Sequence, residues 1–124
     1  MSHDAIRALA HRFFAAIERG DLETVQAIYA ADAIVWHNTD GIAGSVADNL
    51  KTLANFIKFV PERRYTQQRL DVFDGGFAEQ HLLKGKLVSG KEVSLAACIV
   101  CQVEDGRIIR LDEYFDSAAL AAWR

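Results

Sequence analysis

Glu113 is the residue of this chain whose type and setting best suit acid–base chemistry. It lies in a predicted strand over residues 107–115, where alternation puts its side chain on one face with Ile109, Leu111 and Phe115. A carboxylate among apolar side chains is costly unless it is paired, hydrogen-bonded or open to a wet cavity. Burial also raises the pKa of a carboxyl group, so such a group can transfer protons near neutral pH. From this strand alone, a carboxylate that reaches water at the rim of the sheet is the simpler interpretation.

The second candidate for proton transfer is His37, which follows a short predicted strand between Trp36 and Asn38. Imidazole titrates near neutral pH, so a histidine at this place could serve in catalysis or hold a structural hydrogen bond. The sequence leaves open which of the three side chains faces inward. His81, in the middle of a later strand, is interpreted as a core or interface histidine. No set of His, Cys, Asp or Glu has convincing metal-ligand spacing, so we expect no metal and no other cofactor.

The two cysteines, Cys98 and Cys101, have the spacing of a redox or zinc motif but fall inside one predicted strand. Positions three apart in a strand face opposite sides, so the two sulfur atoms cannot easily meet or share a metal. We therefore expect both thiols to be reduced and at least partly buried.

The bulk composition is that of an ordinary globular protein. The chain has 124 residues, of which 51% are hydrophobic and 25% charged, so a single domain over residues 1–124 is expected. The net charge is −3 without long runs of one sign, which does not suit nucleic-acid binding. No apolar stretch approaches the ~20 residues of a membrane span, and no signal-peptide pattern is present. We expect a cytoplasmic protein that binds neither membranes nor nucleic acid.

Helical patterns come first along the chain and strand patterns follow. Apolar spacing predicts a helix over about 4–19, a short helix capped by Asp21, and a third helix that begins at Ser45 and ends at Pro61. A short strand over 33–36 precedes the third helix. After the proline, turn residues separate four longer predicted strands, over 64–73, 77–88, 91–104 and 107–115. This order predicts the α+β class.

Three segments of the chain resemble the SnoaL-like branch of the nuclear transport factor 2-like superfamily, and the likeness covers nearly the whole chain. They are residues 13–25 with their continuation 28–33, the Val-Trp-His-Asn run at 35–38, and residues 104–116 with Leu-Asp-Glu-Tyr-Phe-Asp at their end. The resemblance implies a cone, in which a strongly curved, mainly antiparallel sheet wraps around N-terminal helices and encloses an apolar pocket. Members include ketosteroid isomerases, polyketide cyclases, limonene-epoxide hydrolases and proteins without catalytic activity.

The catalytic residues of these relatives carry over only in part. Ketosteroid isomerases place an aspartate base where this chain has His37, and an oxyanion-binding tyrosine where it has Phe13. Limonene-epoxide hydrolases have a catalytic aspartate where this chain has Glu113. Their second aspartate and its arginine fall at Leu82 and Gln80. Neither set of catalytic residues is complete in this chain. The resemblance therefore implies a pocket with His37 and Glu113 as the catalytic candidates, but no particular reaction.

The expected pocket is mostly apolar with few polar groups, as is usual for small-molecule sites. Its expected polar contacts are His37, Gln80 and Glu113. Its expected apolar lining is Phe13, Val35, Phe56, Leu82, Leu95, Ala97, Ile99 and Phe115. The helix residues expected to be buried against the sheet are Phe13, Ile17, Leu53 and Ile57.

The outer face of the sheet is mixed in polarity and is expected to pair two copies in a homodimer. Its expected interface residues include Tyr65, Gln67, Arg69 and Gln102. Three functions stay open. The chain could be an acid/base enzyme of the isomerase, cyclase or epoxide hydrolase type that acts on a small hydrophobic molecule. It could instead be a ligand-binding or dimerisation module without turnover, or a structural protein whose pocket is filled by side chains. A pocket that contains both His37 and Glu113 favours the enzyme.

Overall fold

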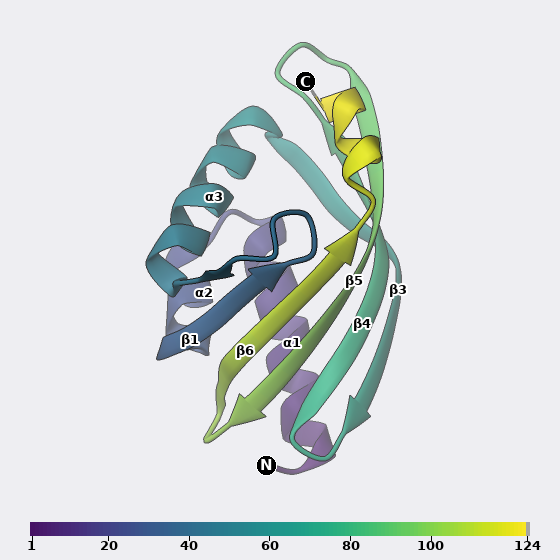
Figure 1. Ribbon diagram of the computed structural model, residues 1–124. Coiled ribbons are helices and arrows are strands. Elements are labelled where there is room, and N and C mark those ends of the chain that lie inside the picture. Colours follow the sequence, from purple (N-terminus) through teal and green to yellow (C-terminus); the bar gives the residue numbers. More distant parts are fainter. Residues whose placement is uncertain (124) are drawn as a thin grey trace.

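A computed structural model describes residues 1–123 and shows one curved sheet with helices on its concave side (Figure 1). Its elements are α1 (His3–Glu18), α2 (Leu22–Ile28), β1 (Tyr29–His37), β2 (Ala43–Gly44), α3 (Val46–Phe59), β3 (Glu62–Phe73), β4 (Gly76–Lys86), β5 (Glu92–Glu104), β6 (Arg107–Phe115) and the 3-10 helix η1 (Ser117–Trp123). The strand order is β2-β1-β6-β5-β4-β3. Among the strands of residues 1–123, only β1 and β6 pair in parallel, so the sheet is mainly antiparallel and the predicted α+β class is confirmed.

Each α-helix begins at the polar side chain that its sequence provides. Ser2, Asp21 and Ser45 accept hydrogen bonds from backbone N–H groups in the first turns of α1, α2 and α3. Such caps satisfy amide groups that have no partner within the helix. α3 ends at Phe59, two residues before Pro61, because proline cannot continue a helix. The sequence signals for the helix boundaries were therefore sufficient.

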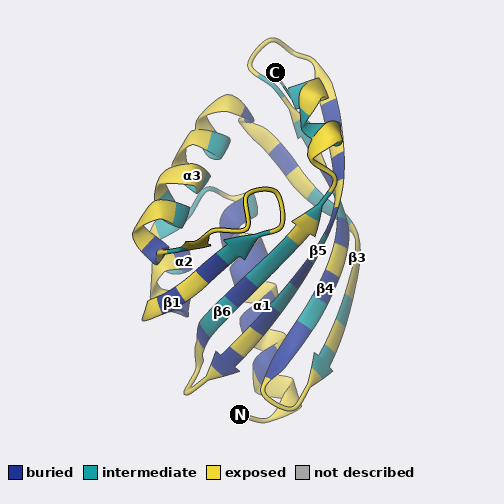
Figure 2. Ribbon diagram, in the orientation of Figure 1, coloured by how far each residue is buried: buried dark blue, intermediate teal, exposed yellow. Residues whose placement is uncertain are grey.

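α1 fills the concavity of the sheet, whereas α3 lies at its edge. Phe13 and Ile17 of α1 are buried in the core, as expected. Leu53 and Ile57 of α3 are only half-buried, so the expectation of full burial is wrong for them. The reason is their position, since α3 packs on β1 and α2 rather than under the centre of the sheet. Figure 2 shows the difference: α1 carries a buried face, while α3 is largely exposed.

The inner face of β6 departs from simple alternation. The register between β5 and β6 shifts between Gln102 and Val103. Ile108 is therefore buried in the core, and Ile109, which was expected there, is half-buried. An extra residue in one strand changes which side chains face inward. Beyond the shift the alternation is regular, and Glu113 pairs with Ile99, a buried residue of the inner face.

Tyr65 of β3 also faces the helices, not the outside as expected. It lies two positions after the buried Arg63, so both side chains are on the same face of the strand. Its ring lies 5.2 Å from that of Phe14 and 4.6 Å from that of His81. Tyr65 therefore cannot belong to the expected interface on the outer face. The other three members of that group are exposed: Gln67, Arg69 and Gln102.

The two cysteines lie on opposite faces of β5, as predicted. Cys101 is buried in the core, and Cys98 is half-buried on the outer face beside Tyr114. Both are free thiols.

Arg63 ties the ends of two helices to β3. Its Nε donates to the carbonyl oxygen of Ile17 at 3.0 Å, and its Nη1 donates to that of Val60, also at 3.0 Å. The last carbonyl groups of a helix lack partners within it and carry partial negative charge. A buried guanidinium therefore both satisfies these carbonyl groups and gains from their dipoles.

Replacing this guanidinium should destabilise the fold. We expect Arg63→Met to lower the free energy of unfolding by roughly 1.5–3 kcal/mol, since hydrogen bonds from a charged donor to buried acceptors are lost. Chemical denaturation measures the change. The matched control is Arg64→Met at the next, exposed position, which should have little effect. Equal losses for the two variants would contradict this account.

Candidate functional site

The parallel pairing of β1 and β6 places His37 directly beside Glu113. Nε2 of His37 lies 2.9 Å from Oε1 of Glu113. The two side chains are 25% and 22% exposed, so solvent or a ligand can reach them. The structure thus brings together the two residues that sequence reasoning selected as catalytic candidates.

Asn38 fixes the end of β1, and this explains why His37 is the inward residue. The backbone N–H of Asn38 donates to the carbonyl oxygen of Glu113 at 3.0 Å. Its side-chain amide donates to the carbonyl oxygen of Phe115 at 3.1 Å and accepts from the N–H of Phe115 at 3.0 Å. Trp36 faces the outer side, where its ring lies 5.2 Å from that of Tyr114. Of the three adjacent candidates, only His37 points towards the helices.

The carboxylate of Glu113 dominates the electrostatics of this pair. Its contact with His37 raises the pKa of the imidazole above the ordinary value of 6.5, and the charge of Asp40 adds to the effect, while burial opposes it. The pair therefore favours an imidazolium beside a carboxylate. The charge of Glu113 also contributes, after burial, to the raised pKa values of the Tyr29 and Tyr65 phenols.

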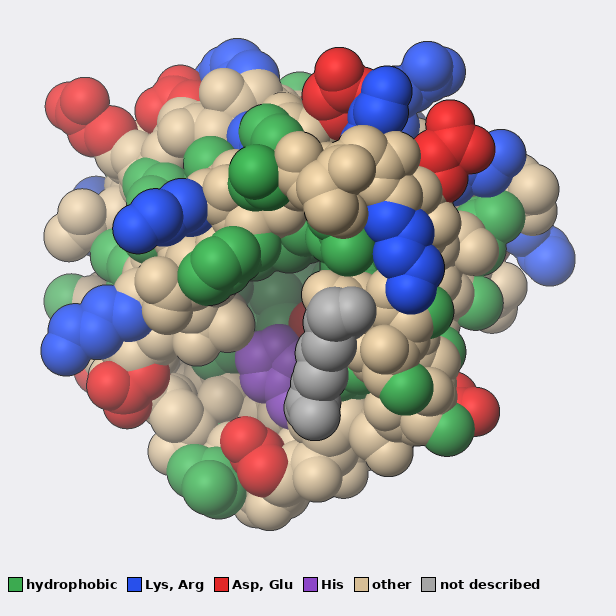
Figure 3. Space-filling model, turned by 90° about the horizontal axis from the view of Figure 1, so that it is seen from above, with side chains coloured by type: hydrophobic (Ala, Val, Ile, Leu, Met, Phe, Trp, Pro, Cys, Tyr) green, Lys and Arg blue, Asp and Glu red, His purple; other side chains and the backbone are tan. Residues whose placement is uncertain are grey.

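A cavity of about 200 Å³ opens beside His37. It lies between β1, β2 and α3, and its lining is more polar than the expected pocket: Val35, His37, Asp40, Ile42, Gly44, Ser45, Asp48, Asn49 and Thr52. Figure 3 looks down on the molecule into a hollow that has hydrophobic side chains around it and a histidine in its wall. The hollow is open to solvent in this view.

Most of the expected apolar lining lies on the inner face around the pair. Val35, Leu95, Ala97 and Ile99 are buried there. Phe115 is half-buried, with its ring 6.4 Å from that of His37. Two expected residues lie further off. Phe13 is in the core below Tyr29, and the half-buried Phe56 packs on Trp123 of η1 with ring centroids 6.2 Å apart.

Gln80 and Leu82 do not belong to the inner face, so the expectation that they line the pocket is wrong. The inward residues of β4 are the alternating, buried positions Glu79, His81 and Leu83. Gln80 is exposed and Leu82 half-buried on the other side. Their assignment came from the alignment with epoxide hydrolases, and a one-residue difference in register moves a side chain to the opposite face.

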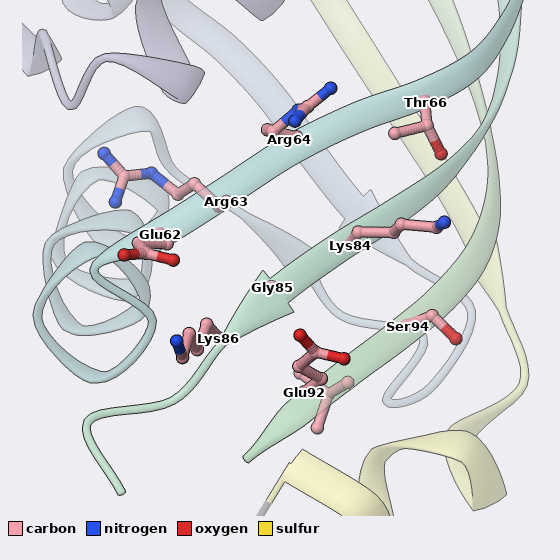
Figure 4. A pocket seen from close by; sticks show the side chains of 10 residues that line it. Glu62, Arg63, Arg64, Thr66, Lys84, Gly85, Lys86, Glu92 and Ser94 are labelled. Atoms are coloured by element: carbon pink, nitrogen blue, oxygen red, sulfur yellow. The ribbon is translucent and has the colours of Figure 1, made fainter. Parts of the chain in front are cut away.

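A larger groove of about 560 Å³ lies at the far end of β3, β4 and β5. Figure 4 shows the side chains that line it, which include Arg64, Lys84, Lys86, Glu62 and Glu92. Arg64, Lys84 and Ser94 lie side by side in the register, one position away from the inward Tyr65, Leu83 and Leu95. The groove is therefore on the outer face, separate from the His37–Glu113 pair.

Within residues 1–123, no three His, Cys, Asp or Glu side chains are grouped so that they could hold a metal ion. In this same part of the chain, none of the helices has the length and apolar character needed to cross a membrane.

Comparisons with known proteins place the chain in a family. Residues 10–111 match the family model of the SnoaL-like domain. The chain belongs to the SnoaL-like family. A comparison with curated protein sequences finds no match.

Solved structures with the same fold include proteins proposed as enzymes. A proposed hydroxylase, AclR from Streptomyces galilaeus, is 17% identical with a TM-score of 0.88 and covers 98% of this chain and 82% of its own. A proposed polyketide cyclase from Xanthomonas campestris is 17% identical with a TM-score of 0.86 and covers 98% of each chain. IdmH, a proposed polyketide cyclase from Streptomyces antibioticus, is 19% identical with a TM-score of 0.83 and covers 94% of this chain and 96% of its own. At these identities the likeness shows the fold alone.

This SnoaL-like domain holds a second acid–histidine pair that sequence reasoning did not assign to a site. Nδ1 of His81 lies 2.5 Å from Oε1 of Glu79, and Gln68 donates to Oε2 of Glu79 at 3.0 Å. The side chains of Glu79 and His81 are each 1% exposed. Their spacing of two residues, on a strand face shared with Phe77 and Leu83, was the signal that could have identified them as an inward pair.

Titration of His37 tests the pair in this SnoaL-like domain. We expect the ring resonances of His37 to titrate above pH 6.5, and Glu113→Gln to lower that pKa because the carboxylate is removed. A histidine with a raised pKa in the folded state stabilises the fold fully below its unfolded value, and this stabilisation is lost as the pH rises through the folded value. Glu113→Gln should therefore cost more stability just below pH 6.5 than at alkaline pH.

Nuclear magnetic resonance follows the ring, and denaturation at each pH gives the stability. Glu104→Gln, at an exposed position near the end of β5, is the control and should leave the pKa of His37 unchanged. An unchanged pKa in Glu113→Gln would show that the contact is not formed in solution.

Proposed function

We propose that this SnoaL-like domain is a cofactor-independent acid/base enzyme that acts on a small hydrophobic molecule. The observation that carries the proposal is the contact of 2.9 Å between His37 and Glu113, with both side chains partly exposed. The names of similar structures, which include proposed polyketide cyclases and a proposed isomerase, support a reaction of this kind.

The pair supplies a base and an acid at one point. The carboxylate of Glu113 can accept a proton from the ligand, for instance from a carbon next to a carbonyl group. The imidazolium of His37 can donate a proton to a developing oxygen anion or to a leaving oxygen. The raised pKa of His37 keeps more of the imidazole protonated near neutral pH. Isomerisation and cyclisation need these two steps in some order, and hydrolytic epoxide opening needs them with an attacking water molecule as the source of the proton that Glu113 accepts.

The surroundings of the pair suit an apolar ligand. Across the sheet from Glu113 lies Ile99, and beside it Ala97 faces Phe115. These side chains offer an apolar floor next to two polar groups, which is the usual composition of a small-molecule site. Few polar contacts then orient the ligand, and most of its binding free energy comes from burial of apolar surface.

Loss of either proton-transfer group should reduce turnover. A panel of apolar ketones, enones and epoxides identifies a compound that the wild-type protein converts. With that compound, we expect Glu113→Gln to lower kcat by a factor of about 100 to 10,000, and His37→Ala to lower it also, because general acid–base catalysis contributes factors of this size. Steady-state kinetics measure the change, and Glu104→Gln is the matched control.

The alternative is a binding module without turnover. It would be supported if compounds bind beside His37, no compound of the panel is converted, and Glu113→Gln leaves their affinity unchanged. Full activity of Glu113→Gln on a converted compound would refute the catalytic role of the pair.

We also propose that the outer face of the sheet pairs two copies of the chain. Ile34 and Tyr114 are 38% and 47% exposed on this face, beside Trp36. Exposed aromatic and aliphatic side chains with charged neighbours such as Arg110 are typical of protein interfaces. Pairing through one shared patch is the commonest arrangement of homodimers.

Light scattering tests the pairing. We expect a mass of twice 13.8 kDa at micromolar concentration, and a monomer for Ile34→Arg, since two symmetry-related cations would face a buried apolar patch. Val88→Arg, which also replaces an exposed aliphatic residue but in the turn after β4, should leave the mass of the assembly unchanged. A monomeric wild-type protein would contradict the proposal.

A further inference from the structure

The groove of about 560 Å³ on the outer face contains two cations that lie side by side. Arg64 of β3 is directly opposite Lys84 of β4, which in turn is directly opposite Ser94 of β5. All three residues are exposed and line the groove, and Figure 4 shows them on three neighbouring strands. Like charges that face each other across a strand pair repel and destabilise the sheet. The fold therefore keeps two cations together although this arrangement lowers its stability.

The neighbouring row of the same groove has balanced charges. There Lys86 lies between Glu62 and Glu92, so an acidic residue is opposite the cation on each side. The row of Arg64 and Lys84 ends in a serine instead, and within residues 1–123 neither cation forms an ion pair. The row on the other side of the two cations is uncharged: Thr66, Leu82 and Ala96. The charge of Arg64 and Lys84 is therefore left for an anion from outside the protein.

The three side chains in this row suit a phosphate group. Neighbouring strands are about 4.8 Å apart, so Arg64 and Lys84 can contact one anion together. The guanidinium group can donate two parallel hydrogen bonds, the ammonium group supplies a point charge, and the hydroxyl group of Ser94 can donate as well. A phosphate monoester carries close to two negative charges near neutral pH and has three strong acceptor oxygen atoms. It therefore matches both the charge and the number of donors, whereas a carboxylate would balance only one of the two cations.

The groove has room for more than the phosphate group. Sites for small molecules have volumes of about 300–1,000 Å³, and the groove lies within this range. The rest of the ligand is thus a small organic molecule that lies along the strands.

We propose that Arg64, Lys84 and Ser94 bind the phosphate group of a small, soluble phosphate monoester in this groove. The site is independent of the proposed acid/base pair, because the two lie on opposite faces of the sheet. It is formed by β3, β4 and β5, whereas the proposed dimer contact at Ile34 and Tyr114 lies on β1 and β6. The two proposals therefore concern different parts of the outer face.

Phenyl phosphate and phenyl sulfate test this site, because they have similar shapes and carry about two and one negative charges at about pH 7.5. At constant ionic strength, wild-type protein should bind phenyl phosphate more tightly, with saturable amide shifts at the three proposed residues in magnetic resonance titrations. Arg64→Gln and Lys84→Gln should each weaken this binding roughly fivefold to tenfold, since a charge-assisted contact is lost in a groove that water and salt partly screen. Arg69→Gln is the matched control and should leave the affinity unchanged, because it removes a cation from an exposed position of β3 outside the groove.

Thermal unfolding gives a second, independent measurement. A ligand that binds only the folded state stabilises it by mass action. Phenyl phosphate should therefore raise the Tm of the wild-type protein and of Arg69→Gln more than that of Arg64→Gln. Without ligand, Arg64→Gln should not lower the Tm, since it relieves the repulsion with Lys84. A lower Tm would show that Arg64 is held by protein groups and would overturn the inference.

Three further results would overturn the proposed phosphate site. The first is the absence of saturable shifts with phenyl phosphate. The second is equal weakening by Arg64→Gln and Arg69→Gln, or equal affinity for the two probes, because attraction by the surface charge alone would then explain the binding. The third is binding to vesicles of phosphatidylcholine and phosphatidic acid without binding of phenyl phosphate, which would assign the groove to a lipid phosphate. None of these results bears on turnover at the acid/base pair.

Discussion

The parallel pairing of β1 and β6 is the constraint on which the site depends. These strands are separated by most of the chain, yet their ends coincide at His37 and Glu113. Parallel strands run in the same direction, so the groups at their carboxyl ends meet at one edge of the sheet. Asn38 then bridges the two strand ends with both its backbone and its amide. The remaining strands follow as antiparallel neighbours and extend the inner face that α1 covers.

The concave side contains two acid–histidine pairs with the same chemistry and different surroundings. Glu79 and His81 are enclosed, and every polar contact of the carboxylate is made by protein groups. A buried polar group that is satisfied in this way stabilises one arrangement of the core. His37 and Glu113 are partly exposed, and His37 lines the cavity between β1, β2 and α3, so this pair is accessible where the other is not. The two pairs therefore consist of the same residue types and differ in their exposure to solvent.

The helices, the strands and the candidate residues His37 and Glu113 could be predicted from the sequence. The face of the sheet on which each strand residue lies could be predicted only in part. Helix caps such as Ser45 and helix breakers such as Pro61 act locally, so they can be recognised from the sequence alone. The face of a side chain depends on register, which a single bulge shifts. For this reason the placement of Ile109 was wrong, while the placements of Gln80 and Leu82 failed through an alignment across weakly similar chains. The hydrogen bond from Gln68 to Glu79 was not predicted, because it depends on the bulge in β3.

The family shares a fold but not a reaction, so specificity must lie in the wall residues of each member. Here the floor of Ala97 and Ile99 is apolar, whereas Asp40, Asp48 and Asn49 make the cavity beside α3 polar. In the proposed function an apolar ligand would bind along this floor, because burial of its own apolar surface is favourable. Polar groups at the two sides of the floor then fix its direction, since a buried polar atom of the ligand is costly without a partner. The proposed site would therefore select ligands by the position of their polar atoms as much as by their size.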